Sequence, residues 1–281
     1  MTGSFFETAG PAVRLELVSA RGSTPREVGT VMYVSADRTE GTIGGGRLEF
    51  IAIEAAREML STGAGESQLE IPLGPEIGQC CGGYVVISLL RLDAGMLARE
   101  AVRRDEARRD RPAIYIFGAG HVGRALAAAT SLLPVPTVLV DEREEQLALC
   151  HAPVEQRLTP LPEAEVRRAP PGSAFVVLTH DHALDFIVVA EALMRGDAAY
   201  VGMIGSKTKR ASFERWCEKS SAPVGDTAPL VCPIGSGGSG DKRPEVIAAF
   251  VAAEVIARLT EARAAGDAAT QQELGGGGLH G

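Results

Sequence analysis

The chain has 281 residues, about the length of two domains, and 45% of them are hydrophobic, as is ordinary for a globular protein. Its formal net charge of −8 argues against nucleic acid or an anionic membrane surface as the main partner, because both attract clustered Lys and Arg. No apolar run reaches the roughly 18 residues of a membrane span and the N-terminus lacks a signal-peptide pattern, so we expect a cytoplasmic protein with mostly reduced cysteines.

Four apolar runs in the first third of the chain predict strands, at residues 12–19, 30–35, 67–73 and 83–92. In the segment between the second and the third run, apolar residues recur at the spacing of one helical face: Leu48, Ile51, Ala52, Ala55 and Met59. Strands combined with one amphipathic helix predict a small α+β domain over residues 1–92.

Residues 93–111 carry dense charge and precede a proline, which predicts a solvated helix and linker between two domains. Over residues 112–264 short apolar runs alternate with helix-like stretches, as in a parallel sheet with crossover helices, so we expect a Rossmann-like domain. The segment 244–259 is apolar around nearly all of a helix, which favours burial or an interface, and we expect a homodimer. The glycine-rich end, 265–281, predicts a flexible tail.

A glycine fingerprint opens the second domain. Gly118, Gly120 and Gly123 follow an apolar strand and begin a helix in "IYIFGAGHVGRALA". The first glycine permits a tight turn, the second lets a diphosphate approach the backbone, and the third lets helix and strand pack closely. Asp141 ends the next predicted strand 18 residues after Gly123, where a ribose-binding acid is expected. This arrangement predicts a nucleotide-type fold, and NAD(P) is one candidate ligand.

The segment "THDHALD" follows a later predicted strand and can be interpreted in two ways. Its side chains have the chemistry of metal ligands: His180, Asp181, His182 and Asp185. In the alternative interpretation, Asp181 caps the next helix and His180 lines the cleft at the carboxyl ends of the strands.

Two other predicted strand ends also carry candidate site residues. Ser206 and Lys207 follow a glycine at the start of a helix, where they would either meet an anion or serve as a plain N-cap beside a solvated lysine. Cys232 precedes a glycine-rich loop and is either a buried structural cysteine or a residue that lines the cleft.

Glycine runs also mark the first domain. Gly44, Gly45 and Gly46 precede its predicted helix, Arg26 lies in the loop "STPR", and Gln79, Cys80 and Cys81 lie in "GQCCGG". Adjacent thiols fill a core poorly and adjacent glycines cost backbone entropy, so these loops favour close approach to a polar, bulky ligand.

These motifs together resemble the XdhC/CoxI family, the xanthine dehydrogenase accessory proteins. "GSTPREVGTVM", "GTIGGGRLE" and "GQCCGG" are similar to its first domain, and "IFGAGHVGRALA", "VDERE", "LTHDHALD", "VGMIGSKTKR" and "CPIG" are similar to its Rossmann domain. The resemblance covers about residues 12–260 in a consistent order. It singles out these residues: Arg26, the Gly44–Gly46 run, Glu49, Gln79, Cys80 and Cys81 in the first domain, and the 118–123 glycines, His180, Ser206, Lys207 and Cys232 in the second.

The resemblance implies a factor that binds molybdenum cofactor, protects it, and supports its sulfuration and insertion into a molybdenum hydroxylase client, with a cysteine desulfurase as a further candidate partner. A cysteine thiolate at Cys80 or Cys81 suits the metal or a transferred sulfur. Two alternatives stay open: an NAD(P)-dependent oxidoreductase, which the fingerprint and Asp141 allow, and a thiol redox sensor built on Cys80 and Cys81.

Overall fold

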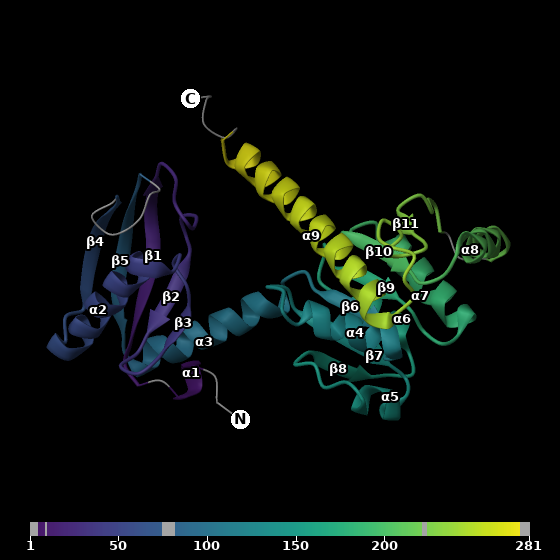
Figure 1. The fold of residues 1–281 in the computed structure, drawn as a ribbon, viewed down its shortest axis with the longest axis horizontal. Coiled ribbons are helices and arrows are strands. Elements are labelled where there is room, and N and C mark those ends of the chain that lie inside the picture. The colour runs from purple at the N-terminus through teal and green to yellow at the C-terminus, as the bar shows by residue number, and fades with distance from the viewer. Residues whose placement is uncertain (1–4, 9, 75–81, 221–223, 276–281) are drawn as a thin grey trace. The chain divides into compact units, whose positions relative to one another are not determined.

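The computed structural model describes residues 5–8, 10–74, 82–220 and 224–275 (Figure 1). The chain divides into two compact units between Ala107 and Arg108. This division falls within the charged segment at which the sequence predicts a domain boundary. Each unit has its own sheet and its own buried apolar clusters.

The first unit is built on an antiparallel sheet of five strands in the order β3-β2-β1-β5-β4. Its strands are β1 (Ala12–Arg21), β2 (Val31–Val34), β3 (Thr39–Gly41), β4 (Glu66–Leu73) and β5 (Gly83–Leu92). The four strands predicted from apolar runs are all present. Strand β3 was not predicted, because its sequence Thr-Glu-Gly has no apolar residue and it lies at the edge of the sheet.

Helix α2 (Gly46–Thr62) packs against one face of this sheet. Its buried residues are Leu48, Ala52, Ala56 and Met59. The predicted helical face is therefore confirmed, although Ala56 is buried in place of the partly exposed Ala55.

Helices α1 (Phe5–Thr8) and α3 (Ala94–Arg109) contact residues of the opposite face of the sheet. Side chains alternate along a strand, so Tyr33 points to the face of the sheet opposite α2. On that face it packs with Leu97 of α3. The Tyr33 hydroxyl donates a hydrogen bond to Glu100, and the Arg104 guanidinium lies 5.1 Å from the Tyr33 ring centroid. Helix α3 thus differs from the predicted solvated linker, because one of its faces belongs to the first unit.

The second unit contains a parallel sheet of six strands in the order β11-β10-β9-β6-β7-β8. Its strands are β6 (Ile114–Phe117), β7 (Thr137–Asp141), β8 (Glu155–Leu158), β9 (Ala174–Val177), β10 (Tyr200–Met203) and β11 (Leu230–Val231). Strand β8 was not predicted, because its sequence Glu-Gln-Arg-Leu is polar and mostly exposed at the sheet edge.

Helices cover both faces of the parallel sheet, so its central strands are buried on both sides. The helices are α4 (His121–Thr130), α5 (Glu144–Ala148), α6 (Pro162–Arg168), α7 (His182–Arg195), α8 (Lys207–Lys219) and α9 (Pro244–Gly275). Residues of α4 and α9 pack on one face, and residues of α6, α7 and α8 pack on the other. An α+β unit followed by a Rossmann-like unit confirms the predicted fold class.

Helix α9 is buried along one side only. Ala248, Val251 and Val255 are buried, whereas Phe250 is 38% exposed. The helix continues to Gly275, beyond the residue at which the sequence predicts a flexible tail. Its alanine-rich sequence before the glycine run favours a helix, which accounts for the difference.

The turn from β6 to α4 explains the spacing of the three fingerprint glycines. Gly118 has a φ of 114°, and a Cβ there would lie 2.3 Å from the carbonyl oxygen of Leu178. A Cβ at Gly123 would lie 1.8 Å from the carbonyl oxygen of Gly118. A Cβ at Gly120 would have no heavy atom within 4 Å. Packing therefore requires glycine at the first and third positions, whereas the second position has open space around it.

We expect Gly123→Ala to lower the free energy of unfolding by at least about 2 kcal/mol, because the added methyl group meets backbone that cannot move aside. Gly120→Ala is the matched control and should change it by less than about 0.5 kcal/mol. Urea denaturation followed by circular dichroism measures both values. Equal stability of the two variants would contradict this account of the turn.

Candidate functional site

The N-terminus of α4 is the first feature of the candidate site. Gly120 is its N-cap residue, no side chain caps it, and its first turn contains no acidic residue. The first amides of a helix lack intrahelical partners and carry the positive end of the helix dipole. Together with the open space at Gly120, they form a place where a phosphate can approach the backbone.

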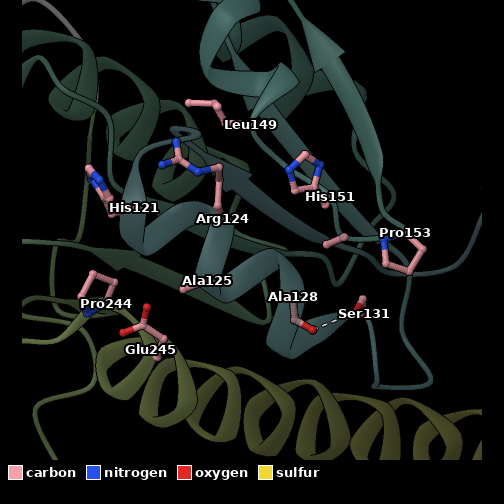
Figure 2. Close-up of a pocket in the computed structure, with 11 residues that line it drawn as sticks. His121, Arg124, Ala125, Ala128, Ser131, Leu149, His151, Pro153, Pro244 and Glu245 are labelled. Atoms are coloured by element: carbon pink, nitrogen blue, oxygen red, sulfur yellow. Dashed lines mark hydrogen bonds between the residues drawn. The ribbon is translucent and has the colours of Figure 1, made fainter.

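A pocket of about 530 Å³ lies along the outer face of α4 (Figure 2). Ala125 and Ala128 line it on the helix, and His151 and Glu245 line it from neighbouring segments. Arg124 also borders the pocket, but its Nη1 donates hydrogen bonds to the Ala119 carbonyl and to the Gln146 side chain. The pocket therefore lies next to the start of α4, but the fingerprint turn remains the candidate site, because Arg124 at the border of the pocket is already hydrogen-bonded within the protein.

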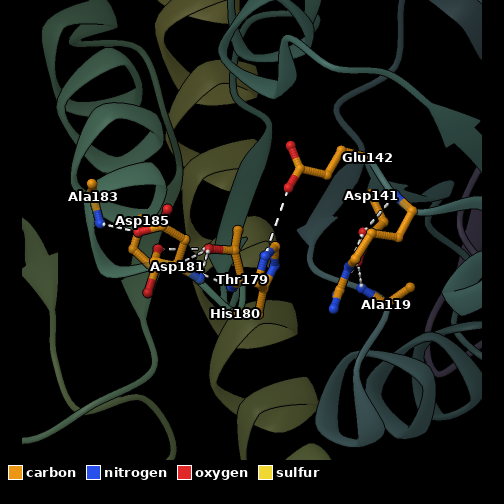
Figure 3. A network of polar contacts seen from close by, with 9 residues as sticks. Ala119, Asp141, Glu142, Thr179, His180, Asp181, Ala183 and Asp185 are labelled. Atoms are coloured by element: carbon orange, nitrogen blue, oxygen red, sulfur yellow. Dashed lines mark hydrogen bonds and ion pairs between the residues drawn. The ribbon is translucent and has the colours of Figure 1, made fainter.

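Asp141 ends β7, where the fingerprint places a ribose-binding acid, but donors of the protein surround its carboxylate (Figure 3). Oδ2 accepts hydrogen bonds from the Ala119 backbone N–H at 2.6 Å and from Arg143 Nη2 at 3.0 Å. Oδ1 accepts them from the Arg143 backbone N–H at 3.0 Å and from Arg143 Nε at 2.9 Å. The carboxylate thus holds the glycine turn in place, and its side chain is only 3% exposed.

Burial alone would raise the pKa of Asp141, but hydrogen bonds from the Arg143 side chain and from the backbone of Ala119 and Arg143 outweigh it. The pKa of Asp141 therefore lies below its usual value, and the group is ionised at neutral pH. Arg143 shows the reciprocal effect, since the hydrogen bond to Asp141 raises its pKa.

The strand order has a switch point at β6, because the chain proceeds from β6 to β7 on one side and returns to β9 on the other. Ligands of open parallel sheets bind at such a switch point. Glu142 follows β7 and His180 follows β9, and the two side chains face each other across it (Figure 3). His180 Nε2 lies 3.7 Å from Glu142 Oε1, and both side chains are substantially exposed. His180 therefore lies at the carboxyl edge of the sheet, and its role in lining a ligand cleft stays a prediction.

The acidic residues near His180 have structural roles. The Asp181 carboxylate accepts a hydrogen bond from the Ala183 N–H at 2.7 Å, so the predicted helix cap is confirmed. Asp185 is completely buried. Its carboxylate accepts hydrogen bonds from the backbone N–H and the hydroxyl of Thr179 and forms an ion pair with Lys209. Within the described part of the chain, no three His, Cys, Asp or Glu side chains are grouped as metal ligands.

Ser206, Lys207 and Cys232 lie near the carboxyl ends of β10 and β11. The Ser206 hydroxyl accepts a hydrogen bond from the Lys209 backbone N–H at 3.2 Å and caps α8, whereas Lys207 is exposed. The Cys232 thiol lies 3.7 Å from the Ser206 carbonyl oxygen as a hydrogen-bond donor. Burial raises the pKa of Cys232, although Lys209 and Arg210 act in the opposite direction. Cys232 is thus a buried, protonated thiol that follows the edge strand β11.

In the first unit, Glu49 organises the glycine run before α2. One of its carboxylate oxygens accepts hydrogen bonds from the Thr42 hydroxyl and from the backbone N–H groups of Ile43 and Gly45. A Cβ at Gly44 would lie 2.5 Å from Pro25 Cγ, so this run packs against the loop that carries Arg26. The structure therefore brings two of the predicted loops of the first unit together.

Arg26 is exposed, whereas Gly45 is partly buried, and a Cβ at Gly45 would have no heavy atom within 4 Å. Gly82 belongs to the third glycine motif and forms a parallel bridge with Ser23. Gln79, Cys80 and Cys81 lie outside the described residues, so their roles stay predictions.

Two sequence-family models match this chain. The XdhC Rossmann domain matches residues 114–255, about half of the chain, and the model described as XdhC and CoxI family matches residues 6–71. The chain belongs to the XdhC and CoxI family. The fingerprint turn, Asp141, His180 and Cys232 all lie in the segment that matches the XdhC Rossmann domain.

The chain is also similar to a protein of Escherichia coli in sequence and to a solved structure from Bacillus halodurans in fold. The uncharacterised protein YqeB of Escherichia coli is 26% identical over 258 residues, which are 88% of this chain but only 43% of YqeB. A solved structure from Bacillus halodurans, described as a xanthine dehydrogenase, covers 92% of this chain and 96% of its own with a TM-score of 0.72. Its sequence identity is 18%, so this likeness shows the fold.

Sequence reasoning did not identify the roles of Arg143 and Glu142. The spacing Asp-x-Arg directly after a strand was a usable signal, because Arg143 can fold back on an acid two residues earlier. No local sequence pattern predicts that Glu142 faces His180, because the two residues follow β7 and β9, and the order of strands in the sheet brings these strand ends near each other.

We expect Asp141→Asn to lower the free energy of unfolding by about 1–3 kcal/mol at neutral pH, because buried charge-assisted hydrogen bonds are lost. The folded-state pKa of Asp141 is below that of an unfolded Asp, about 3.9, so its stabilisation is complete above that pH and is lost as the pH falls through the folded-state value. The gap between parent and variant should therefore close as the pH falls below about 3.9. Urea denaturation over a pH series measures it.

Asp241→Asn is the matched control. Asp241 is paired with Arg243 at the same spacing and through the same Nε and Nη2 atoms, but at the surface and without a contact to the glycine turn. Its replacement should leave the stability nearly unchanged at every pH. A loss equal to that of Asp141→Asn would show that the pairing alone, and not the hold on the turn, matters.

Proposed function

We propose that this protein binds molybdenum cofactor and supports its sulfuration and insertion into a molybdenum hydroxylase of the xanthine dehydrogenase type. Membership of the XdhC and CoxI family supports an accessory role. The observation that carries the binding proposal is the N-terminus of α4, which no side chain caps and where Gly120 leaves open space, at the switch point of the parallel sheet.

The described residues fit the phosphate end of the cofactor. Gly120 leaves room for a phosphate to approach the backbone, and the first turn of α4 carries no acid that would repel it. His180, which follows β9, adds a polar group at the same carboxyl edge of the sheet. Backbone N–H groups at a helix N-terminus are a common way to hold a phosphate.

The bound cofactor would supply a molybdenum centre able to accept a sulfur ligand. The second unit would hold the phosphate at α4. Cys80 and Cys81 are proposed separately as thiols for the metal or for a transferred sulfur, because thiolates suit soft metal centres and sulfur transfer. A cysteine desulfurase as sulfur source, a molybdenum hydroxylase as client and a homodimeric state are parts of the same proposal.

The oxidoreductase alternative has little support from the site, because Asp141 is occupied by the protein's own donors. The redox-sensor alternative depends on Cys80 and Cys81 and stays open. In the described part of the chain no helix is long and apolar enough to cross a membrane.

Fluorescence of pterin released from the full chain, purified from cells that make molybdenum cofactor, tests the proposal directly. We expect Gly120→Val to reduce the retained pterin by about tenfold or more, because two methyl groups would occupy the approach to the α4 amides. Its circular dichroism spectrum should stay near that of the parent. Gly225→Val, in an exposed loop with equally open space, is the matched control and should retain pterin. A parent protein without pterin would contradict the proposal.

The two adjacent cysteines generate a separate expectation. Replacing both Cys80 and Cys81 by serine removes the soft ligand while nearly conserving volume, so the fold should survive. Cofactor retention, or activation of a client apo-enzyme by sulfurated cofactor, should fall by about tenfold or more, with Cys81 as the more sensitive position. Cys217→Ser, at a partly exposed position of α8, is the control and should be neutral. Full activity of the double variant would remove these thiols from the mechanism.

A further inference from the structure

The hydrogen bonds of Asp141 bear on which ligands the fingerprint turn accepts. Fingerprint turns of this spacing commonly bind dinucleotides, and an acid at the end of the second strand then accepts hydrogen bonds from the ribose hydroxyls. A carboxylate offers about four acceptor positions, two on each oxygen. In Asp141 all of them are used, one by Ala119 and three by Arg143. A ribose diol would find no acceptor there.

A ribose that carries a 2′-phosphate is excluded for a different reason. Such phosphates are usually held by an arginine near this strand end. Here the Nε and Nη2 atoms of Arg143 both point at Asp141, so this edge of the guanidinium is already engaged.

Glu142 and His180 add to this restriction. They follow the strands on either side of β6, and their side chains approach to 3.7 Å (Figure 3). A nucleoside extending from the turn between the loops after β7 and β9 would have to separate them. An exposed ion pair of this kind contributes little free energy, so the exclusion of dinucleotides depends mainly on Asp141 and Arg143.

We propose that Asp141 and Arg143 determine the specificity of the fingerprint turn, so that it excludes ribose-bearing dinucleotides and accepts a ligand that ends in a phosphate monoester. This inference rests on the proposed function, whose cofactor has such an end, and it names the ligand class that the site selects. Arg143 acts here as a positioning residue, because it engages the carboxylate that would otherwise bind ribose.

Fluorescence titration of the full chain with NADH and with NADPH tests the inference. The parent should show no saturable binding below roughly millimolar concentration of either dinucleotide. Arg143→Ala frees acceptor positions on both oxygens of Asp141, so its affinity for NADH should rise by about tenfold or more, which is about 1.4 kcal/mol. Its affinity for NADPH should not rise, because the carboxylate, no longer neutralised, repels the 2′-phosphate. Arg243→Ala removes the equivalent surface pair and should change neither affinity.

Micromolar binding of either dinucleotide by the parent would overturn the inference. A folded Arg143→Ala variant without a gain for NADH would do the same. Arg143→Lys keeps the charge but loses the forked contact, so it provides a second variant with a smaller gain expected for NADH. If neither variant folds, the parent titration decides.

The outcomes separate this inference from the proposed function. Pterin in the purified protein together with micromolar NADH binding would leave the proposed function standing and remove the inference. Absence of pterin with dinucleotides still excluded would remove the proposed function, while the role of Asp141 and Arg143 in rejecting ribose would stand.

Discussion

The hydrogen bond from the Ala119 N–H to Asp141 is the interaction on which the candidate site depends. It joins the end of β7 to the middle of the turn between β6 and α4, next to the bond from the Gly118 N–H to the Val140 carbonyl. A buried carboxylate is tolerated only when its charge is paired and its oxygens are hydrogen-bonded, and Arg143 satisfies both needs. The same contacts that make this charge acceptable in the interior therefore fix the position of the α4 N-terminus.

The first unit solves a similar problem in a similar way. In the turn before α2, the Glu49 carboxylate accepts hydrogen bonds from two backbone N–H groups, those of Ile43 and Gly45. In both units a carboxylate shapes a glycine turn at the start of a helix, although Glu49 comes from that helix and Asp141 from a neighbouring strand. An acidic residue near a glycine motif can therefore serve the turn itself, whether the family resemblance singles it out, as for Glu49, or the fingerprint spacing does, as for Asp141.

The sequence predicted the parts of the fold that depend on local pattern. Apolar runs located the central strands, and the glycine spacing located the turn whose packing requires Gly118 and Gly123. It did not predict β8, because a polar edge strand is defined by pairing with β7. Nor did it predict that α3 packs on Tyr33, because this contact joins residues 67 positions apart. The position of Asp141 was predicted correctly, but its partners follow from the side-chain geometry of Arg143, which no periodicity reveals.

A turn held by its own protein contacts is ordered before any ligand arrives. Conformational entropy that a flexible loop would lose on binding has already been lost on folding, so few contacts suffice for useful affinity. The same rigidity means that the turn offers no opening motion of its own to expel what it holds. For the carrier proposed here, release would then have to be driven by the recipient, whose tighter grip on the cofactor would determine the direction of transfer.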